Sequence, residues 1–141
     1  MKYISNSREE TFELGRSFGM NASPGDIICL DGDLGAGKTV FAAGFAAGLG
    51  IRNVVASPTF TIIREYEGGR LPFYHFDVYR IEEPEEMYEL GYEEYFFGDG
   101  VCLIEWASLI DELIPESAKR FIIKRMPEKD EDFRSIETED L

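Results

Sequence analysis

A glycine-rich octapeptide between an apolar run and an alanine-rich run constrains the fold of this chain more than any other feature. Residues 32–39 read Gly-Asp-Leu-Gly-Ala-Gly-Lys-Thr and match the pattern G-x-x-x-x-G-K-[ST] at every fixed position. The preceding residues 26–30 are typical of a buried strand, and residues 39–49 are expected to form a helix. A strand, a glycine-rich loop and a helix in this order form a phosphate-binding loop, or P-loop.

The residue types of this loop suit a nucleoside triphosphate. Glycines let the backbone curl so that successive N–H groups point at phosphate oxygens, and the helix that follows directs its positive end at the same place. Lys38 is expected to reach the β- and γ-phosphates, and the Thr39 hydroxyl to ligate Mg²⁺. We interpret Gly44 and Gly48, on the following helix, as allowing close helix–sheet packing. The loop residues predicted to bind the nucleotide are Gly32, Asp33, Gly35, Ala36, Gly37, Lys38 and Thr39.

The remaining patterns predict one α/β domain. A chain of 141 residues can bury one core but is too short for two comfortable ones, so a single domain over 1–141 is expected. Ser7 and Glu10 form a capping box that opens a helix over 8–19. The other expected elements are strands at 26–30, 61–66, 71–76, 101–104 and 120–124, an acidic helix at 84–90, helical turns at 108–113 and an edge strand at 133–137.

Buried strands that alternate with helices favour a P-loop NTPase-like domain, with a mixed, mainly parallel sheet flanked by helices. Two glycines at 68–69 join the runs 61–66 and 71–76 and predict a β-hairpin after the P-loop helix. The acidic C-terminal segment 128–141 is expected to be mobile.

Two acids are candidates for completing a magnesium site, because P-loop proteins place an acid at the end of a neighbouring buried strand. Asp77 ends one run and Glu105 ends another. The run before Glu105 is the more continuously apolar, so it should lie beside the P-loop strand. We therefore assign Glu105 to Mg²⁺, through water. Asp77 becomes the candidate for orienting the attacking water, with a helix cap or a pairing with Arg80 as the alternatives.

Three further residues have two interpretations each. Thr59 lies in Ser-Pro-Thr between the P-loop helix and the hairpin, where nucleotide hydrolases carry switch segments; a plain turn is the alternative. His75, the one histidine, alternates with apolar neighbours, which favours a structural role over catalysis. Trp106 follows Glu105 directly and is either a core aromatic or part of the site.

The net charge is −14, from 28 acidic and 14 basic side chains. Residues 82–99 hold eight acids and no base, and residues 128–141 hold seven acids and two bases, so the rest of the chain is almost neutral. Strong acidity disfavours a large nucleic-acid footprint and docking on an anionic membrane. Segment 82–99 either faces a basic surface on a partner or is a solvated helix face.

The start of the chain has no apolar signal-peptide core, and no apolar run is long enough to span a membrane. Two cysteines within β-like runs, Cys29 and Cys102, favour buried thiols in a reducing compartment. We therefore expect a cytoplasmic protein.

Four segments together resemble one known family. They are residues 32–39, Ser-Pro-Thr-Phe-Thr at 57–61, His-Phe-Asp-Val-Tyr-Arg at 75–80 and Leu-Ile-Glu-Trp at 103–106. Their order and spacing resemble the TsaE (YjeE) family of bacterial P-loop ATPases of tRNA threonylcarbamoyladenosine biosynthesis. The resemblance runs from about residue 11 to 106. Ala107 and Val40 depart from it, since the family often has proline and threonine at these positions, but neither change removes a phosphate or metal ligand.

The resemblance implies an ATPase that requires ATP and Mg²⁺ and works with TsaB and TsaD proteins. TsaD-type enzymes modify the adenosine beside the anticodon, so contact with tRNA is expected only indirectly, through the complex. Lys38 and Thr39 would hold phosphates and metal, Glu105 would serve the magnesium, and Asp77 and Thr59 would belong to the catalytic or switch apparatus. Outside the P-loop, Thr11 and Arg134 look like further nucleotide contacts.

Two other functions stay open. The chain could be an ATP-gated binding module, in which the nucleotide only orders a partner-binding surface. A small-molecule kinase is less well supported, because no basic cluster suits a second phosphorylated substrate. GTP is disfavoured because no N-K-x-D motif is present.

Overall fold

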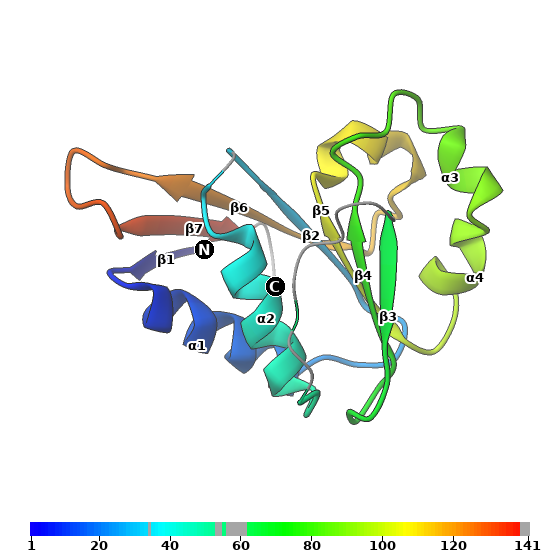
Figure 1. Ribbon diagram of the computed structural model, residues 1–141, viewed down its shortest axis with the longest axis horizontal. Helices are drawn as coiled ribbons and strands as arrows, with labels where there is room; N and C mark the ends of the chain where they lie inside the picture. Colours follow the sequence, from blue (N-terminus) through cyan, green and yellow to red (C-terminus); the bar gives the residue numbers. More distant parts are fainter. Residues whose placement is uncertain (34, 53–54, 56–61, 139–141) are drawn as a thin grey trace.

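The computed structural model describes residues 1–33, 35–52, 55 and 62–138. Within them, seven strands form one sheet in the order β1-β7-β6-β2-β5-β4-β3 (Figure 1). The elements are β1 (Lys2–Ser5), α1 (Arg8–Met20), β2 (Ile27–Gly32), α2 (Lys38–Gly48), β3 (Ile63–Tyr66), β4 (Phe73–Asp77), α3 (Glu86–Glu89), α4 (Tyr92–Phe96), β5 (Val101–Glu105), the 3₁₀ helix η1 (Ala107–Leu113), β6 (Lys119–Arg125) and β7 (Arg134–Thr138).

The expected α/β fold is confirmed. Strands β4, β5, β2 and β6 are mutually parallel, whereas β3 and β7 run antiparallel to their neighbours. The β3–β4 pair is the hairpin expected after the P-loop helix. As expected, β5 lies directly beside β2. The carboxyl ends of four parallel strands therefore meet at one edge of the sheet, which is where open α/β sheets place their ligands.

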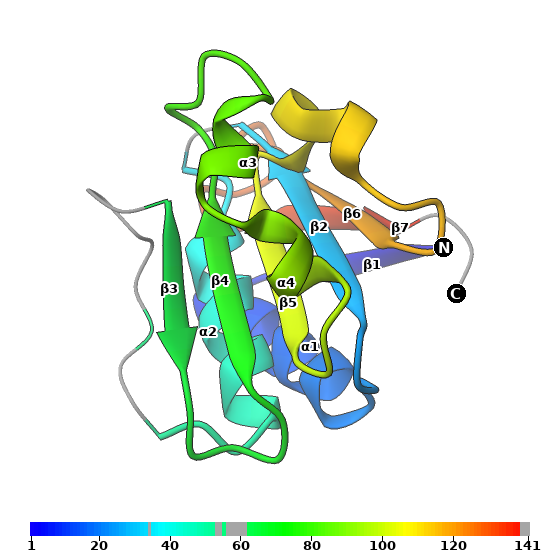
Figure 2. The same cartoon turned by 90° about the vertical axis from the view of Figure 1, so that its right-hand side faces the viewer.

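Helices cover both faces of the sheet, with α1 and α2 on one side and α3, α4 and η1 on the other (Figure 2). Alternate residues of β2 enter different cores, since Ile28 and Leu30 pack with α2 whereas Ile27 and Cys29 pack with α4 and η1. This double burial explains the unbroken apolar runs of the central strands.

Glycines allow α1 and α2 to pack in direct backbone contact. A Cβ atom at Gly15 or Gly19 of α1 would overlap a carbonyl oxygen of α2, and one at Gly44 or Gly48 of α2 would overlap a carbonyl oxygen of α1. The expectation that Gly44 and Gly48 serve helix–sheet packing is therefore wrong: they face another helix. The contact joins the helix that follows the P-loop to the helix that carries Thr11.

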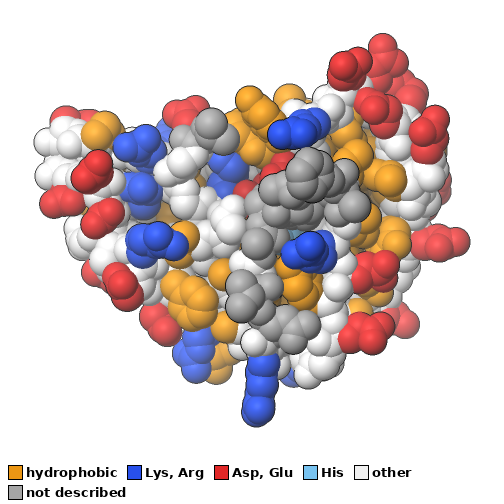
Figure 3. All heavy atoms as spheres, in the orientation of Figure 1, with side chains coloured by type: hydrophobic (Ala, Val, Ile, Leu, Met, Phe, Trp, Pro, Cys, Tyr) orange, Lys and Arg blue, Asp and Glu red, His pale blue; other side chains and the backbone are white. Residues whose placement is uncertain are grey.

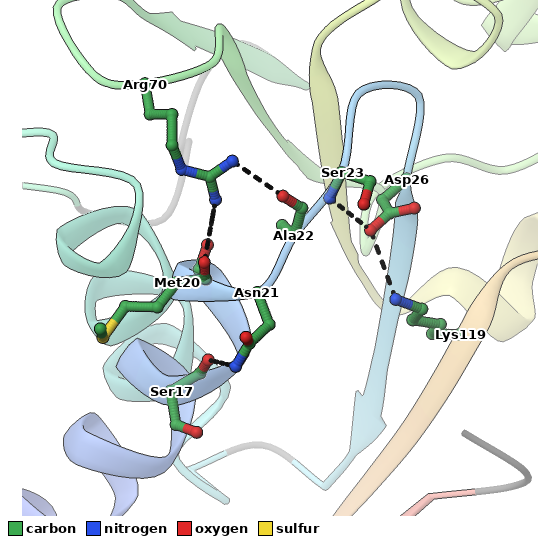
Figure 4. Close-up of polar contacts among 9 residues, drawn as sticks. Ser17, Met20, Asn21, Ala22, Ser23, Asp26, Arg70 and Lys119 are labelled. Atoms are coloured by element: carbon green, nitrogen blue, oxygen red, sulfur yellow. Dashed lines mark hydrogen bonds and ion pairs between the residues drawn. The ribbon is translucent and has the colours of Figure 1, made fainter.

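The edge of the sheet remote from the P-loop is tied together by Arg70, in the β3–β4 turn (Figure 4). Its guanidinium donates to the carbonyl oxygens of Ala22 and Gly19, each at 2.9 Å, and so satisfies acceptors at the end of α1. Nearby, Lys119 of β6 pairs with Asp26 at 3.3 Å. These contacts hold the turns that enter β2 and β4.

Several elements differ from the expectations. Strand β1 was not expected, and β7 lies between β1 and β6, so its predicted edge position is wrong. The acidic helix is shorter than 84–90 and is followed by α4, which was also not expected. The expected mobility of 128–141 stays a prediction, although residues 134–138 are paired on both sides.

No helix among the described residues has both the length and the apolar character that crossing a bilayer requires. The cytoplasmic location expected from the sequence stays a prediction.

Both cysteines are expected to be unreactive in the folded protein. Burial raises the pKa of Cys29 and of Cys102 to about 12, so at pH 8 neither thiol ionises to the nucleophilic thiolate. A disulfide reagent such as DTNB should label neither thiol in native protein and both in urea. Rapid labelling of native protein at pH 8 would show that the strand interiors open readily.

Candidate nucleotide-binding site

A cavity of about 440 Å³ opens at the carboxyl edge of the central strands. It brings together eight of the residues predicted from the sequence, namely Thr11, Gly35, Gly37, Lys38, Thr39, Asp77, Glu105 and Arg134. Gly32, Asp33 and Ala36 belong to the same loop but do not line the cavity, and Ala36 is buried beneath it. Thr59 lies outside the described residues.

The P-loop turns in a conformation that needs glycine at defined points. Gly37 immediately precedes α2 with a φ of +104°, which side chains disfavour. A Cβ at Gly32 would overlap the carbonyl oxygen of Ile123 in β6. The motif glycines therefore let the loop turn tightly against β6 and begin α2 with its N-terminal amides at the cavity.

Lys38 is a buried cation held by its own loop. Its Nζ donates to the carbonyl oxygens of Gly32 at 2.7 Å and Asp33 at 2.8 Å, and it lies 4.1 Å from the centre of the Trp106 ring. Burial lowers the pKa of Lys38, while the negative charges of Glu105 and Asp77 act in the opposite direction. The charge is thus positioned at the floor of the cavity, beside two carboxylates.

Glu105 and Asp77 end adjacent strands and face each other in register. Glu105 is 3% exposed, and its Oε1 lies 3.5 Å from Oγ1 of Thr39, at the start of α2. Its other oxygen, Oε2, lies 2.6 Å from Nε2 of His75. Asp77 Oδ1 accepts from the backbone N–H of Tyr79. The strand order thus brings a hydroxyl from the P-loop helix and two carboxylates to one side of the cavity.

Trp106 lines the cavity. Among the described residues it is the one non-glycine with a positive φ, at 64°, a conformation that costs about 1–2 kcal/mol. Its backbone N–H donates to the carbonyl oxygen of Leu30, and the centroid of its ring lies 4.7 Å from that of Tyr79. This turn directs the chain from β5 into η1 while the indole covers Lys38. Trp106 thus packs against the core and also lines the cavity, and its role in function stays a prediction.

Arg134 reaches the P-loop from β7. Its Nε donates to the carbonyl oxygen of Ala36 at 2.8 Å, and its Nη1 donates to the carbonyls of Glu131 and Phe133. Arg134 lines the cavity, and its bond to Ala36 braces the loop from outside. The nucleotide contact expected of Arg134 and Thr11 stays a prediction. Thr11 is 2% exposed and shares a 2.7 Å hydrogen bond with Ser5 of β1.

Sequence reasoning missed Arg8 and Asp132, which also line the cavity. Arg8 is the first residue of α1 and Asp132 precedes β7. Neither lies in a recognisable pattern, because each reaches the cavity only through the packing of α1 and β7 beside the P-loop. One group of acidic side chains lies over α3 and α4, and others lie on the opposite side of the same face (Figure 3). Asp77, Glu105 and Asp132 line the cavity itself.

Comparisons with known proteins agree on one family. The model described as "Threonylcarbamoyl adenosine biosynthesis protein TsaE" matches residues 5–136. A TsaE protein of Bacillus subtilis is 53% identical over 125 residues, covering 89% of this chain and 78% of the relative. One from Treponema pallidum is 41% identical over 116 residues, covering 82% and 85%. The crystal structure of Bacillus subtilis YdiB superposes with a TM-score of 0.83 at 46% identity, covering 98% of this chain and 83% of that one. By family model, sequence identity and fold, the chain belongs to the TsaE family of threonylcarbamoyl adenosine biosynthesis proteins.

Proposed function

We propose that this protein is a Mg²⁺-dependent ATPase that acts in the biosynthesis of threonylcarbamoyladenosine in tRNA, together with TsaB-like and TsaD-like proteins. One observation carries the proposal: Lys38 and Thr39 of the P-loop and two carboxylates from neighbouring strand ends converge in one cavity. The names of the relatives supply the pathway. The resemblance noted from the sequence motifs suggests the partners.

The loop residues would bind the triphosphate. The N-terminal amides of α2 supply a positive end at the cavity, and Lys38 adds a full charge that is already desolvated. To contact a γ-phosphate, the Lys38 ammonium would exchange its carbonyl acceptors on Gly32 and Asp33 for phosphate oxygens. Arg134 would keep the loop in shape, because it holds the carbonyl of Ala36 from behind.

The residues present fit Mg²⁺. This ion keeps several waters and is bound through one or two carboxylates together with substrate phosphates. Thr39 Oγ1 and Glu105 Oε1 lie 3.5 Å apart on one side of the cavity. Among the described residues no cluster of three or more acids, histidines or cysteines forms a self-contained metal cage. Thr39 and Glu105 would therefore hold the ion jointly with the nucleotide, and the bound ion would neutralise phosphate charge.

Asp77 is suited to orient an attacking water. It ends β4 in register with Glu105 and lines the same cavity. Fast hydrolysis also needs a positively charged side chain beside the phosphoryl group that is transferred. Arg134 already donates to backbone carbonyls of the β6–β7 turn and the P-loop. Arg8 also lines the cavity, from the first residue of α1. We propose that a partner protein completes the site, so hydrolysis by the isolated protein should be slow.

The acidic surface of the protein disfavours direct binding to tRNA. The chain carries a net charge of −14, and a polyanion needs basic residues for binding. Contact with tRNA would be indirect, through the partner proteins, which would hold the RNA.

Phosphate release from ATP, with and without a TsaB–TsaD complex, tests this proposal. We expect slow release by the protein alone and stimulation of at least about tenfold by the complex, well below the largest effects of an added catalytic arginine. EDTA should abolish the stimulated rate, and TsaB–TsaD alone provides the background.

Two other outcomes would favour the alternative functions. Nucleotide-dependent binding to TsaB–TsaD without turnover would identify an ATP-gated binding module. Phosphate that appears on a metabolite instead of in solution would identify a small-molecule kinase.

A further inference from the structure

A buried histidine lies directly behind the carboxylate that would serve Mg²⁺. His75 is in the middle of β4 and is 0% exposed, and its ring stacks on Phe73 with centroids 6.0 Å apart. Its Nε2 lies 2.6 Å from Oε2 of Glu105, on the adjacent strand β5. Because His75 does not line the cavity, any effect it has on the nucleotide must pass through Glu105.

Hydrogen-bond accounting determines which atom donates. Nδ1 of His75 is buried and has no hydrogen-bond partner among the described residues. A proton on Nδ1 would leave a buried N–H unpaired and would direct the Nε2 lone pair at a carboxylate oxygen. With the proton on Nε2, the imidazole donates to Glu105 and only a weaker acceptor stays unpaired. The geometry thus places a proton on Nε2, from which the ring donates to Glu105.

With this hydrogen bond, the two carboxylate oxygens of Glu105 have different partners. Oε2 is engaged by His75 inside the sheet, whereas Oε1 faces Thr39 Oγ1 at the cavity. Glutamate is long and flexible, and fixing it in one rotamer costs conformational entropy. A hydrogen-bond donor within the sheet can fix the Glu105 rotamer before ATP binds, so that this entropy is not lost on binding.

We propose that His75 is a positioning residue: its Nε2–H orients Glu105 so that Oε1 is presented to Mg²⁺ and its water ligands. The inference rests on the proposed Mg²⁺-dependent binding of ATP. Hydrogen-bond partners behind metal-binding side chains commonly change metal affinity or activity by about 10- to 100-fold, so the effect should be measurable without assaying turnover.

Two amide variants separate orientation from packing. In His75→Gln the amide nitrogen can occupy the position of Nε2 and still donate to Glu105. In His75→Asn the shorter side chain reaches only the position of Nδ1, so the donor is lost while a buried amide is retained. ATP affinity is measured in EDTA and in saturating Mg²⁺ through the fluorescence of the single tryptophan, Trp106. Urea unfolding of each variant is measured in parallel.

Wild type, His75→Gln and His75→Asn should bind ATP within about twofold of one another in EDTA, because the P-loop is unchanged. The gain in affinity on adding Mg²⁺ should fall about tenfold or more in His75→Asn and be largely restored in His75→Gln. An undiminished gain in His75→Asn, or an equal loss in both variants, would overturn the proposal. A wild-type protein that gains nothing from Mg²⁺ would instead refute the proposed function.

A spectroscopic measurement needs no variant to fold. The chain has one histidine, so the ¹⁵N resonances of an untagged, labelled protein report on His75 without ambiguity. We expect the proton on Nε2, with slow exchange, and a shift of that resonance when Mg²⁺ is added to the ATP complex. A proton on Nδ1, or an Nε2 resonance indifferent to Mg²⁺, would contradict the assigned role.

Discussion

Replacing Lys38 by alanine is expected to lower the affinity for ATP by about 100-fold or more and to abolish hydrolysis. The ammonium would donate at least two hydrogen bonds to phosphate oxygens, each contributing about 1.5–3 kcal/mol because both partners are charged. About 1.4 kcal/mol corresponds to a tenfold change in affinity. The change would also remove the positive charge beside Glu105 and Asp77, and so increase their repulsion of the triphosphate. Calorimetric titration with ATP and Mg²⁺ measures the loss.

Two control variants make this result interpretable. Lys38→Met removes the ammonium that lies over Trp106 but keeps most of the buried aliphatic stem, so it should lose affinity like the alanine variant while staying closer to wild type in stability. Lys124→Ala removes an exposed lysine of β6 that does not line the cavity, and should bind ATP normally. Wild-type affinity in a folded Lys38→Ala protein would refute the nucleotide site.

Gly44→Ala should destabilise the protein by about 3 kcal/mol, the upper part of the range for overpacked cores. On an unobstructed helix, alanine is more favourable than glycine by about 1 kcal/mol, so the expected effect has the opposite sign to helix propensity. The reason is steric, because the added Cβ would overlap the carbonyl oxygen of Phe12 in α1. Backbone cannot rotate away as a side chain can, so the two helices must separate. Urea unfolding measures the change.

The neighbouring position supplies the comparison. Ala43→Gly changes the same helix by one methyl group in the other direction, and should cost only about 1 kcal/mol through propensity. A stabilising Gly44→Ala would show that α1 and α2 do not pack this closely. Since α1 carries Thr11 and α2 begins with Lys38, separating the helices in Gly44→Ala should also weaken ATP binding, although Gly44 does not line the cavity.

Local patterns were enough to predict the P-loop, the hairpin and the central strands. The adjacency of β5 and β2 was also predictable, because a strand buried on both faces must lie inside the sheet. Strand β1 escaped prediction because it is only four residues long and its two apolar residues are not both buried. Tyr3 is partly buried, and Ile4 is exposed. The position of β7 escaped because it depends on pairing with β1 at the other end of the chain, as in the hydrogen bond from Met1 N to the Thr138 carbonyl.

In the candidate site, too, some residues could be assigned from the sequence and others could not. Lys38, Thr39 and Glu105 could be assigned from the sequence, because a glycine-rich loop before a helix and an acid after an apolar strand carry their positions in local order. Their partners could not be assigned. His75 meets Glu105 only because β4 and β5 pair in a register that places Asp77 opposite Glu105, and Arg134 meets Ala36 only because β7 lies beside β6.

The sequence by itself determined the P-loop, its buried strand and helix, and the acid at the end of a neighbouring strand, because these depend on residues close together in the chain. The tertiary structure alone decided which groups stand behind them: the histidine that holds Glu105, the arginine that braces the loop, and the helix that closes against α2. These contacts depend on strand order, register and helix separation, which arise from packing between distant segments and leave no local pattern to read.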